Sequence, residues 1–259
     1  MTTIISRFLM DHLELYAQPI VDLTSKKVYF YEILSRVHYK GQLHYPNEFI
    51  FNMSISMRLE LAKTLLVKIG ELQKKHPNIS FSLNISTLEI DMKLDEFLAS
   101  LCKDDFIDPE RCIIEITEQA ALDDMRIYNI LKNLKNTYRF RFAIDDFGTK
   151  FSVLNHVIDK NKERVFDYIK IDGSLIENIE HDHLVYANLC TYLNFIKQNE
   201  KQAIIEYIAT EAIYDIVKEL EPDFLQGFFF GKPMPIEHYL PEYLPANSDI
   251  ESLYMAEGK

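Results

Sequence analysis

Glycine and linker sequence are scarce in this chain. It has only seven glycines in 259 residues, and no Gly/Ser/Pro-rich segment, low-complexity region or clear internal repeat divides it. A linker of that kind is expected between independently folding domains. The sequence therefore predicts one large domain over residues 1–245, followed by a polar, acidic tail over residues 246–259.

Cysteine is also rare, and long hydrophobic runs are absent. The three cysteines, Cys102, Cys112 and Cys190, are odd in number and form no CxxC pair, which argues against a disulfide framework and against structural zinc. No apolar stretch reaches the roughly 18 residues that a membrane span requires. The first residues are not typical of a signal peptide. These absences predict a soluble protein of the reducing cytoplasm, without a membrane span.

Positive charge is in deficit. The chain has 28 Lys and Arg against 40 Asp and Glu, for a formal net charge of −12. A nucleic-acid duplex would repel such a chain, and no Lys/Arg run compensates, so we expect no binding to duplex nucleic acid. If the substrate is a phosphate, some of this negative charge must be neutralised locally. A bound divalent cation would do so.

What the sequence does contain is an alternation of strand-like and helix-like segments. Short apolar or β-branched runs end in a polar residue: VYFYE (28–32), FSLN (81–84), CIIEITE (112–118), FRFAIDD (140–146), FDYIKID (166–172), AIIEYIAT (203–210) and FLQGFFF (224–230). Helical i, i+3/i+4 patterns lie between many of them, over about 54–76, 123–138, 183–198 and 211–220.

Strands that alternate with helices predict a parallel sheet with helical crossovers. About seven or eight such units in about 250 residues favour a closed α/β barrel over two separate domains. A doubly wound open sheet is the alternative, but it would not need polar groups at so many strand ends. In a barrel, the strand-end residues would meet at the C-terminal mouth, where barrel active sites lie.

The strand-end residues share a chemical character. They are Glu32, Asn84, Glu115, Asp145, Asp146, Lys170, Glu206 and Gln226. Carboxylate and amide oxygens suit Mg²⁺ or Mn²⁺, and acids crowded at one mouth would repel each other without cations. An acid can bridge two metals about 3.5–4 Å apart, and a lysine can orient or help to deprotonate a metal-bound water. The set indicates metal-assisted hydrolysis, most naturally of a phosphoester.

The adjacent pair Asp145-Asp146 also has a purely structural interpretation. A DD pair before Phe-Gly is common at the start of a loop or at a helix cap. Spacing and composition do not show that the strand ends converge, so both interpretations stay open at this point.

Seven short motifs, in a fixed order, add a resemblance. They are YAQPIVDL (16–23), YEILSR (31–36), NIS (84–86), EITE (115–118), DDFGT (145–149), KID (170–172) and QGFFFGKPMP (226–235). In this order the chain resembles the EAL-domain family of cyclic-di-GMP phosphodiesterases over about residues 15–235. The resemblance implies an α/β fold, a modified TIM (β/α)8 barrel with one antiparallel strand. It also implies hydrolysis of cyclic-di-GMP to linear pGpG in bacterial second-messenger signalling, a stand-alone EAL domain and a homodimer.

Carried over by position, the resemblance implies a role for each motif residue. A first Mg²⁺ or Mn²⁺ ion would be held by Glu32, Asn84, Glu115 and Asp145. A second ion would be held by Asp145, Asp146 and Glu206. Lys170 would contact the nucleophilic water, and Gln226 would place water or substrate. The dinucleotide would be touched by Gln18 and Arg36, with Asp172 as a further substrate-site residue, and Glu118 would steady the loop after DDFG.

The chain departs from the family pattern at several supporting positions. Ala209 stands where the family has a second glutamate, and Tyr207 where it has a glycine. Lys150 and Val153 replace a glycine and a serine after DDFGT, and Gly173 follows KID where arginine is common. No primary metal ligand is lost, so the resemblance implies an active enzyme with weakened or retuned activity. The alternative is a catalytically weak or inactive protein of this fold that acts as a cyclic-di-GMP receptor or protein-binding regulator.

Overall fold

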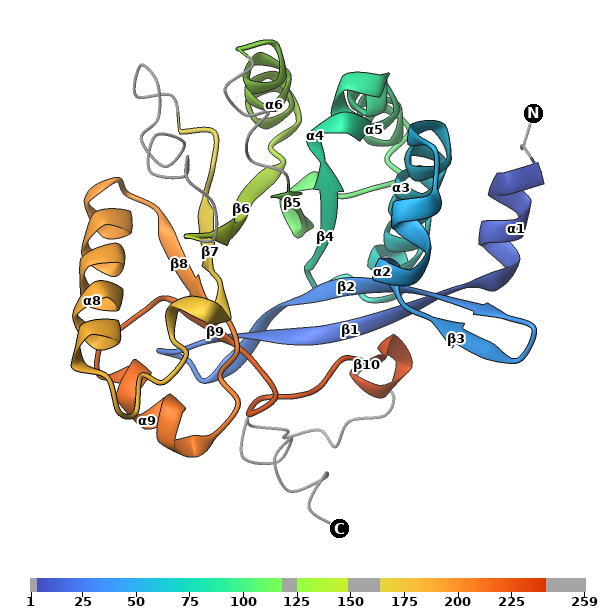
Figure 1. Ribbon diagram of the computed structural model, residues 1–259. Coiled ribbons are helices and arrows are strands. Elements are labelled where there is room, and N and C mark those ends of the chain that lie inside the picture. Colours follow the sequence, from blue (N-terminus) through green and yellow to red (C-terminus); the bar gives the residue numbers. More distant parts are fainter. Residues whose placement is uncertain (1–3, 118–124, 149–163, 241–259) are drawn as a thin grey trace.

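The fold is that of a computed structural model, which describes residues 4–117, 125–148 and 164–240 (Figure 1). Three of the residues singled out above, Glu118, Lys150 and Val153, lie outside the described residues, as does the tail predicted over 246–259. Their predicted roles are therefore not addressed by the structure.

Eight strands form a closed ring. They are β1 (Leu13–Asp22), β2 (Lys27–Tyr39), β4 (Phe81–Ser86), β5 (Cys112–Thr117), β6 (Arg141–Phe147), β7 (Tyr168–Ile171), β8 (Gln202–Ile205) and β9 (Phe224–Gln226). Neighbours from β2 through β9 are parallel. Strand β1 closes the ring and is antiparallel to both β2 and β9. The predicted modified barrel with one antiparallel strand is confirmed.

Two short strands extend the sheet beyond the ring. Strand β3 (Gln42–His44) pairs with the far end of β2, and β10 (Met234–Pro235) pairs with β1. Because β2 continues to Tyr39, Glu32 lies in the middle of a long strand, and the prediction that the run ends at Glu32 is wrong. Residues 31–33 of β2 pair with β4. After them β2 continues beside β1 and pairs with β3 from Val37 to Tyr39, so this later part of the strand leaves the ring.

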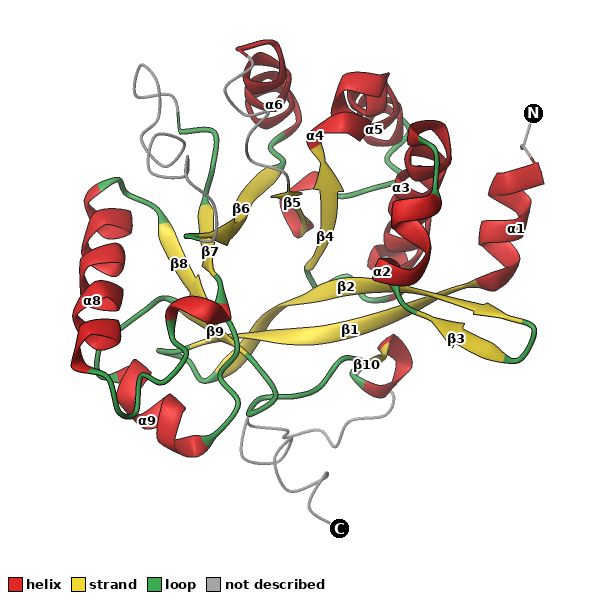
Figure 2. Ribbon diagram, in the orientation of Figure 1, coloured by secondary structure: helices red, strands yellow, loops and turns green. Residues whose placement is uncertain are grey.

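Helices lie around the outside of the ring (Figure 2). The longer ones are α1 (Ile4–His12), α3 (Ile55–Lys75), α5 (Asp95–Lys103), α6 (Met125–Tyr138), α8 (His183–Gln198) and α9 (Glu211–Lys218). The shorter segments are α2 (Pro46–Phe49), α4 (Thr87–Glu89), the 3₁₀ turns at Ile50–Asn52, Pro109–Arg111, Gly173–Leu175 and Ile236–His238, and a π-helical turn at Ile90–Leu94.

The predicted helices begin where side chains can cap them. The hydroxyl of Ser54 accepts a hydrogen bond from the Met57 N–H at the start of α3, and Thr210 accepts one from the Ile213 N–H at the start of α9. Such caps satisfy backbone donors that have no partner within the helix. The periodicity-based helices at 54–76, 183–198 and 211–220 are confirmed to within a few residues.

Two strands are shorter than predicted. The run 203–210 leaves β8 after Ile205, and the left-handed backbone of Tyr207, with φ of 61°, is incompatible with a continuing strand. The run 224–230 leaves β9 after Gln226, where Gly227 comes so close to the backbone of Ile208 that a Cβ atom would lie 2.1 Å from its carbonyl oxygen. The three phenylalanines at 228–230 therefore lie beyond the strand.

Candidate active site

The candidate site forms a polar layer on top of an apolar layer inside the barrel. The apolar layer consists of Ile20, Phe30, Ile113, Ala143, Tyr168, Ile204 and Phe224. In six of these strands the residue two positions further on is a predicted site residue, and in the reversed strand β1 it is the residue two positions earlier, Gln18. Side chains two apart in a strand share a face, so the predicted residues project into the barrel together.

The ammonium group of Lys170 lies among four carboxylates in this layer. Its Nζ atom is 2.6 Å from a carboxylate oxygen of Glu115, 2.9 Å from Glu206, 3.2 Å from Asp145 and 3.4 Å from Glu32. The Lys170 side chain is only 2% exposed. The structure therefore brings four acids together around one buried cation, three from strands β2, β5 and β6 and one from the position directly after β8. These short distances and this burial favour the functional interpretation of Asp145 over a loop start or a helix cap. The spacing of residues in the sequence could not supply either quantity.

Amide side chains complete the arrangement around Glu32. The Nδ2 atom of Asn84 donates to one Glu32 oxygen at 2.7 Å, and Nε2 of Gln226 donates to the other at 2.7 Å. Gln226 Nε2 also lies 3.3 Å from Oε1 of Gln18, whose own Nε2 donates to the carbonyl of Gly231. These bonds fix the orientation of Glu32 and link it to β1.

Burial sets the protonation of two acids. Loss of solvent, reinforced by the nearby charge of Glu32, raises the pKa of Glu115 to about 8, against the attraction of Lys170. Loss of solvent also raises the pKa of Glu206 to about 7. These carboxyls hold protons near neutral pH when Lys170 is the only cation beside them, and a cation that binds them must displace those protons.

The charges on Lys170 and Glu32 support each other. Burial acts to lower the pKa of Lys170, but the surrounding carboxylates raise it well above its ordinary value. Burial acts to raise the pKa of Glu32, but Lys170 and the amide hydrogen bonds outweigh this, and the net pKa lies below the ordinary value. Lys170 therefore stays an ammonium and Glu32 a carboxylate.

The donor set fits a divalent cation. Four acids face a single ammonium, and among the described residues Glu115 Oε1 and Gln226 Oε1 are buried without a hydrogen-bond partner. Such oxygens are the ligands that Mg²⁺ and Mn²⁺ prefer. Within 4–117, 125–148 and 164–240, no group of three acids, histidines or cysteines already surrounds an ion position. The carboxylate oxygens contact the ammonium group of Lys170 instead, and a divalent cation would have to compete with that group for them.

The pair Asp145-Asp146 lies in strand β6, not in a loop or at a helix cap. Pairing between β6 and β7 is irregular between Ile144 and Phe147, and Asp146 has a left-handed backbone with φ of 53°. A bulge of this kind re-aims side chains that regular alternation would send to opposite faces. Asp145 Oδ1 contacts Lys170, and Asp146 follows it in a partly buried position at the same strand end.

The predicted substrate contacts outside the Lys170 cluster occupy other environments. Arg36 is buried on β2 near the rings of Tyr16 and Tyr45, and its Nε has no hydrogen-bond partner among the described residues. Asp172 caps the 3₁₀ turn after β7 by accepting from the Ser174 N–H at 2.9 Å. The structure does not place either side chain against Lys170.

Sequence reasoning missed a cavity of about 360 Å³ beside Asn84. Its lining includes apolar residues of β2 and α3 and the polar residues Arg58, Ser86, Glu89 and Thr117. The Ser86 hydroxyl bonds to the Glu89 carboxylate. The sequence NISTLE (84–89) could have indicated this cavity, because the polar residues Ser86 and Glu89 come shortly after the strand-end asparagine, where the strand passes into a helix.

A protein-family model described as EAL domain matches residues 4–233 of the chain. The chain belongs to the EAL domain family. Similar proteins include the probable cyclic di-GMP phosphodiesterase PdeA of Escherichia coli K12, 30% identical over 86% of this chain, and the cyclic di-GMP phosphodiesterase PdeF of the same organism, 28% identical over 91%. This chain spans about a third of those relatives, since the aligned part is 30% of PdeA and 32% of PdeF.

Solved structures support the same fold. The PaMucR phosphodiesterase in complex with c-di-GMP aligns with a TM-score of 0.76 and 25% identity, covering 89% of this chain and 95% of that one. An EAL domain protein from Listeria monocytogenes EGD-e aligns with a TM-score of 0.75 and 23% identity, covering 92% and 97%. In the described part of this EAL domain, no helix is both long enough and apolar enough to span a membrane.

Proposed function

We propose that this EAL domain is a cytoplasmic, two-metal phosphodiesterase that hydrolyses cyclic-di-GMP to linear pGpG. The observation that carries the proposal is the intact polar layer, in which four acids from separate segments of the barrel converge on Lys170. The names of the relatives supply the substrate class, since PdeF is named a cyclic di-GMP phosphodiesterase and PdeA a probable one.

Each residue of the layer would have a definite task. Glu32, Asn84, Glu115 and Asp145 would hold one ion, and Asp145, Asp146 and Glu206 would hold the other. When bound, such ions lower the pKa of a coordinated water and neutralise phosphate charge. Lys170 Nζ would donate a hydrogen bond to the attacking water, and Gln18 and Gln226, already joined at 3.3 Å, would position the dinucleotide. The apolar layer beneath keeps bulk water out of the barrel interior.

The positioning residues outside this cluster remain part of the proposal. The buried, unpartnered Nε of Arg36 is a donor that a phosphate or base of the dinucleotide could satisfy. Asp172 would act by fixing the turn that follows Lys170. A homodimer also remains a prediction, to be measured by sedimentation.

The test is turnover by the purified protein. With Mn²⁺ or Mg²⁺ and cyclic-di-GMP, we expect pGpG to accumulate, as measured by chromatography. Changing Glu32→Gln should reduce kcat by at least roughly 100-fold. Mutating a residue that only hydrogen-bonds to a metal ligand already lowers activity or metal affinity by about 10–100-fold, and Glu32 is itself a proposed ligand. The matched control is Glu14→Gln, an exposed glutamate on β1, which should retain wild-type turnover.

A receptor role is the second candidate, and Ala209 favours it. This residue is exposed and provides no carboxylate at a position where the family pattern has one. Binding of cyclic-di-GMP without turnover, in the presence of either metal, would support the receptor role and overturn the phosphodiesterase. Turnover that survives Glu32→Gln at the wild-type rate would overturn the proposed mechanism.

A further inference from the structure

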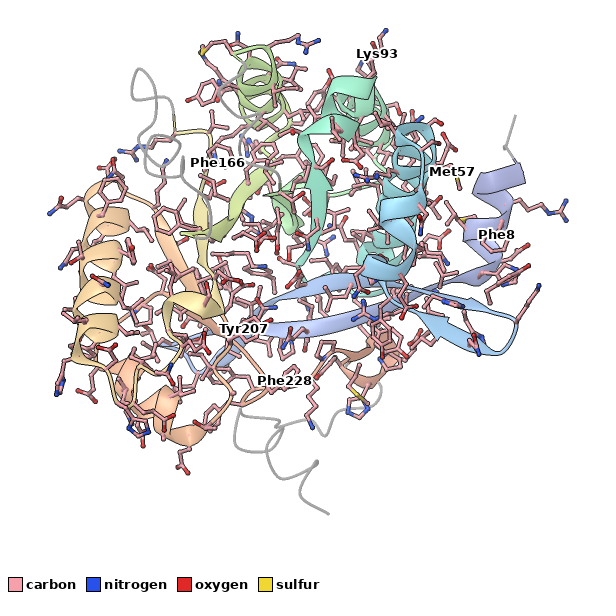
Figure 3. The ribbon with its side chains drawn as sticks, viewed as in Figure 1. Phe8, Met57, Lys93, Phe166, Tyr207 and Phe228 are labelled. Carbon is pink, nitrogen blue, oxygen red and sulfur yellow. The ribbon has the colours of Figure 1, made fainter. Side chains whose placement is uncertain are left out.

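Tyr207 is an unusual residue at the mouth of the barrel. The residue, which is labelled in Figure 3, is 70% exposed, more than any other tyrosine or phenylalanine in the described part of the chain. Its backbone is left-handed, with φ of 61°, a conformation that costs energy for a bulky side chain. Strain of this kind persists where the surrounding structure enforces it, and such positions cluster at functional sites.

Gly173 makes room for this ring. A Cβ atom on Gly173 would lie 2.2 Å from Cγ and 2.4 Å from Cδ2 of Tyr207, distances that no real contact allows. The backbone of Gly173 does not itself need glycine, because its φ lies outside the left-handed region. Tyr207 is therefore the structural reason for a glycine at this position, and the two residues form one unit.

The unit lies directly beside the acids. Tyr207 follows Glu206, whose carboxylate is 2.9 Å from Lys170 Nζ and whose N–H donates to the Ile171 carbonyl. Gly173 comes three residues after Lys170 itself. One side of the ring is seated on Gly173, and most of the remaining ring surface is open to solvent at the edge of the site.

We propose that Tyr207, seated on Gly173, is a stacking platform for one purine base of the cyclic dinucleotide. This inference rests on the proposed function. An exposed aromatic face binds a base through stacking, which needs no hydrogen-bond partner and no charge. The ammonium of Lys170 is held by the four carboxylates and not by Tyr207, so the platform contributes to substrate affinity and leaves the chemical step unchanged.

The first test separates aromatic stacking from bulk. We expect Tyr207→Phe and Tyr207→Trp to keep the wild-type KM and Tyr207→Leu to raise it roughly tenfold, with kcat unchanged in all three. Leucine fills similar space but has no aromatic ring. If Tyr207 only filled space, the leucine variant would therefore have the same KM as the phenylalanine and tryptophan variants. Tyr186→Leu, an aromatic on the outer helix α8, is the matched control and should leave KM unchanged.

The second test uses the contact with Gly173. Gly173→Ala should displace the ring and raise KM about as much as Tyr207→Leu does. In a Tyr207→Gly background, where there is no ring to displace, adding Gly173→Ala should change KM little, so the two effects are not additive. Additive effects on KM, or an unchanged KM in Gly173→Ala, would overturn the proposal.

The platform and the proposed function fail in different ways. The dissociation constant for cyclic-di-GMP, measured by calorimetry on each variant, tests the platform even if the wild type does not turn the ligand over. If the wild type hydrolyses or binds the dinucleotide and Tyr207→Leu binds it equally well or more tightly, the platform is wrong and the proposed function stands. If the wild type neither binds nor hydrolyses it, both are wrong.

Discussion

At the scale of single residues, the charge balance of the site depends on Lys170. Its ammonium is the one cation that the described contacts place among Glu32, Glu115, Asp145 and Glu206. A buried ion pair adds little net stability when it forms, but removing one partner leaves charge without compensation. The same side chain thus holds the acids in place and stands where an attacking water would be oriented.

This makes a sharp prediction for Lys170→Met. Without metal, the variant should lose roughly 3–5 kcal/mol of unfolding free energy, because the buried Glu32 carboxylate and the acids around it lose the ammonium group that compensates them. Mn²⁺ should restore part of this loss, since the ion supplies the missing positive charge. Urea unfolding with and without Mn²⁺ measures both effects.

The matched control is Lys218→Met. Lys218 pairs with Asp215 at 2.5 Å, but both side chains are exposed. Exposed pairs contribute little to stability, so this variant should unfold at nearly the wild-type urea concentration, with or without Mn²⁺. If Lys170→Met also unfolds at the wild-type urea concentration, with and without Mn²⁺, then Lys170 does not balance the negative charge of the buried acids.

At the scale of elements, helix α3 packs so tightly against Phe106 that it holds a glycine where helix propensity favours alanine. Gly70 lies in the middle of α3, where alanine would favour the helix by about 1 kcal/mol. A Cβ atom there would lie 2.6 Å from the Phe106 ring and 2.7 Å from the Phe106 carbonyl oxygen. A carbonyl oxygen in the backbone cannot move aside as a flexible side chain can.

We therefore expect Gly70→Ala to destabilise the protein. The steric cost of overpacking, about 1–3 kcal/mol, outweighs the gain of about 1 kcal/mol in helix propensity because part of the contact is with backbone, so we expect a net loss of up to roughly 2 kcal/mol. Thermal unfolding measures it. The neighbouring exposed residue serves as the control, because Glu71→Ala should change stability by no more than about 0.5 kcal/mol. A more stable Gly70→Ala variant would contradict the prediction.

At the scale of the whole molecule, the buried acids couple stability to pH and to metal. The pKa of Glu206 is raised to about 7 and that of Glu115 to about 8, against an ordinary 4.5. A folded-state pKa above the unfolded value means that the folded protein binds protons more strongly. The contribution of these two groups to stability is therefore fully present below about pH 4.5 and is lost as pH rises through about 7 and about 8.

Metal should reverse this loss. Because an ion competes with these protons, Mn²⁺ should raise the Tm more at about pH 8.5 than at about pH 6. At a hundredfold excess over Kd the rise should be roughly 5–10 °C. Differential scanning calorimetry checks this, and Glu115→Gln, which mimics the protonated acid, should reduce the pH dependence of the metal-free protein. An equal Mn²⁺ effect at both pH values would contradict the assignment of these acids as ligands.

Sequence periodicity was sufficient for much of this fold. The stripe from Ser54 to His76 predicted α3 because the spacing of apolar residues and the capping serine are both local properties. The end of β9 was mispredicted because it depends on the close approach of Gly227 to the backbone of Ile208, a contact between distant segments. A one-dimensional pattern carries no information about such contacts.

The sequence by itself determined which residues of a regular strand share a face, because a strand places every second residue on one face, and it determined their chemistry as acids, amides and a lysine. Only the tertiary structure decided how these groups meet. It placed four carboxylates within 3.4 Å of Lys170 Nζ, bulged β6 at Asp145-Asp146, and seated Tyr207 on Gly173. The physical reason is that strand period fixes direction within one segment. Distances between segments, and hence charge balance, pKa and steric fit, arise only when the ring closes.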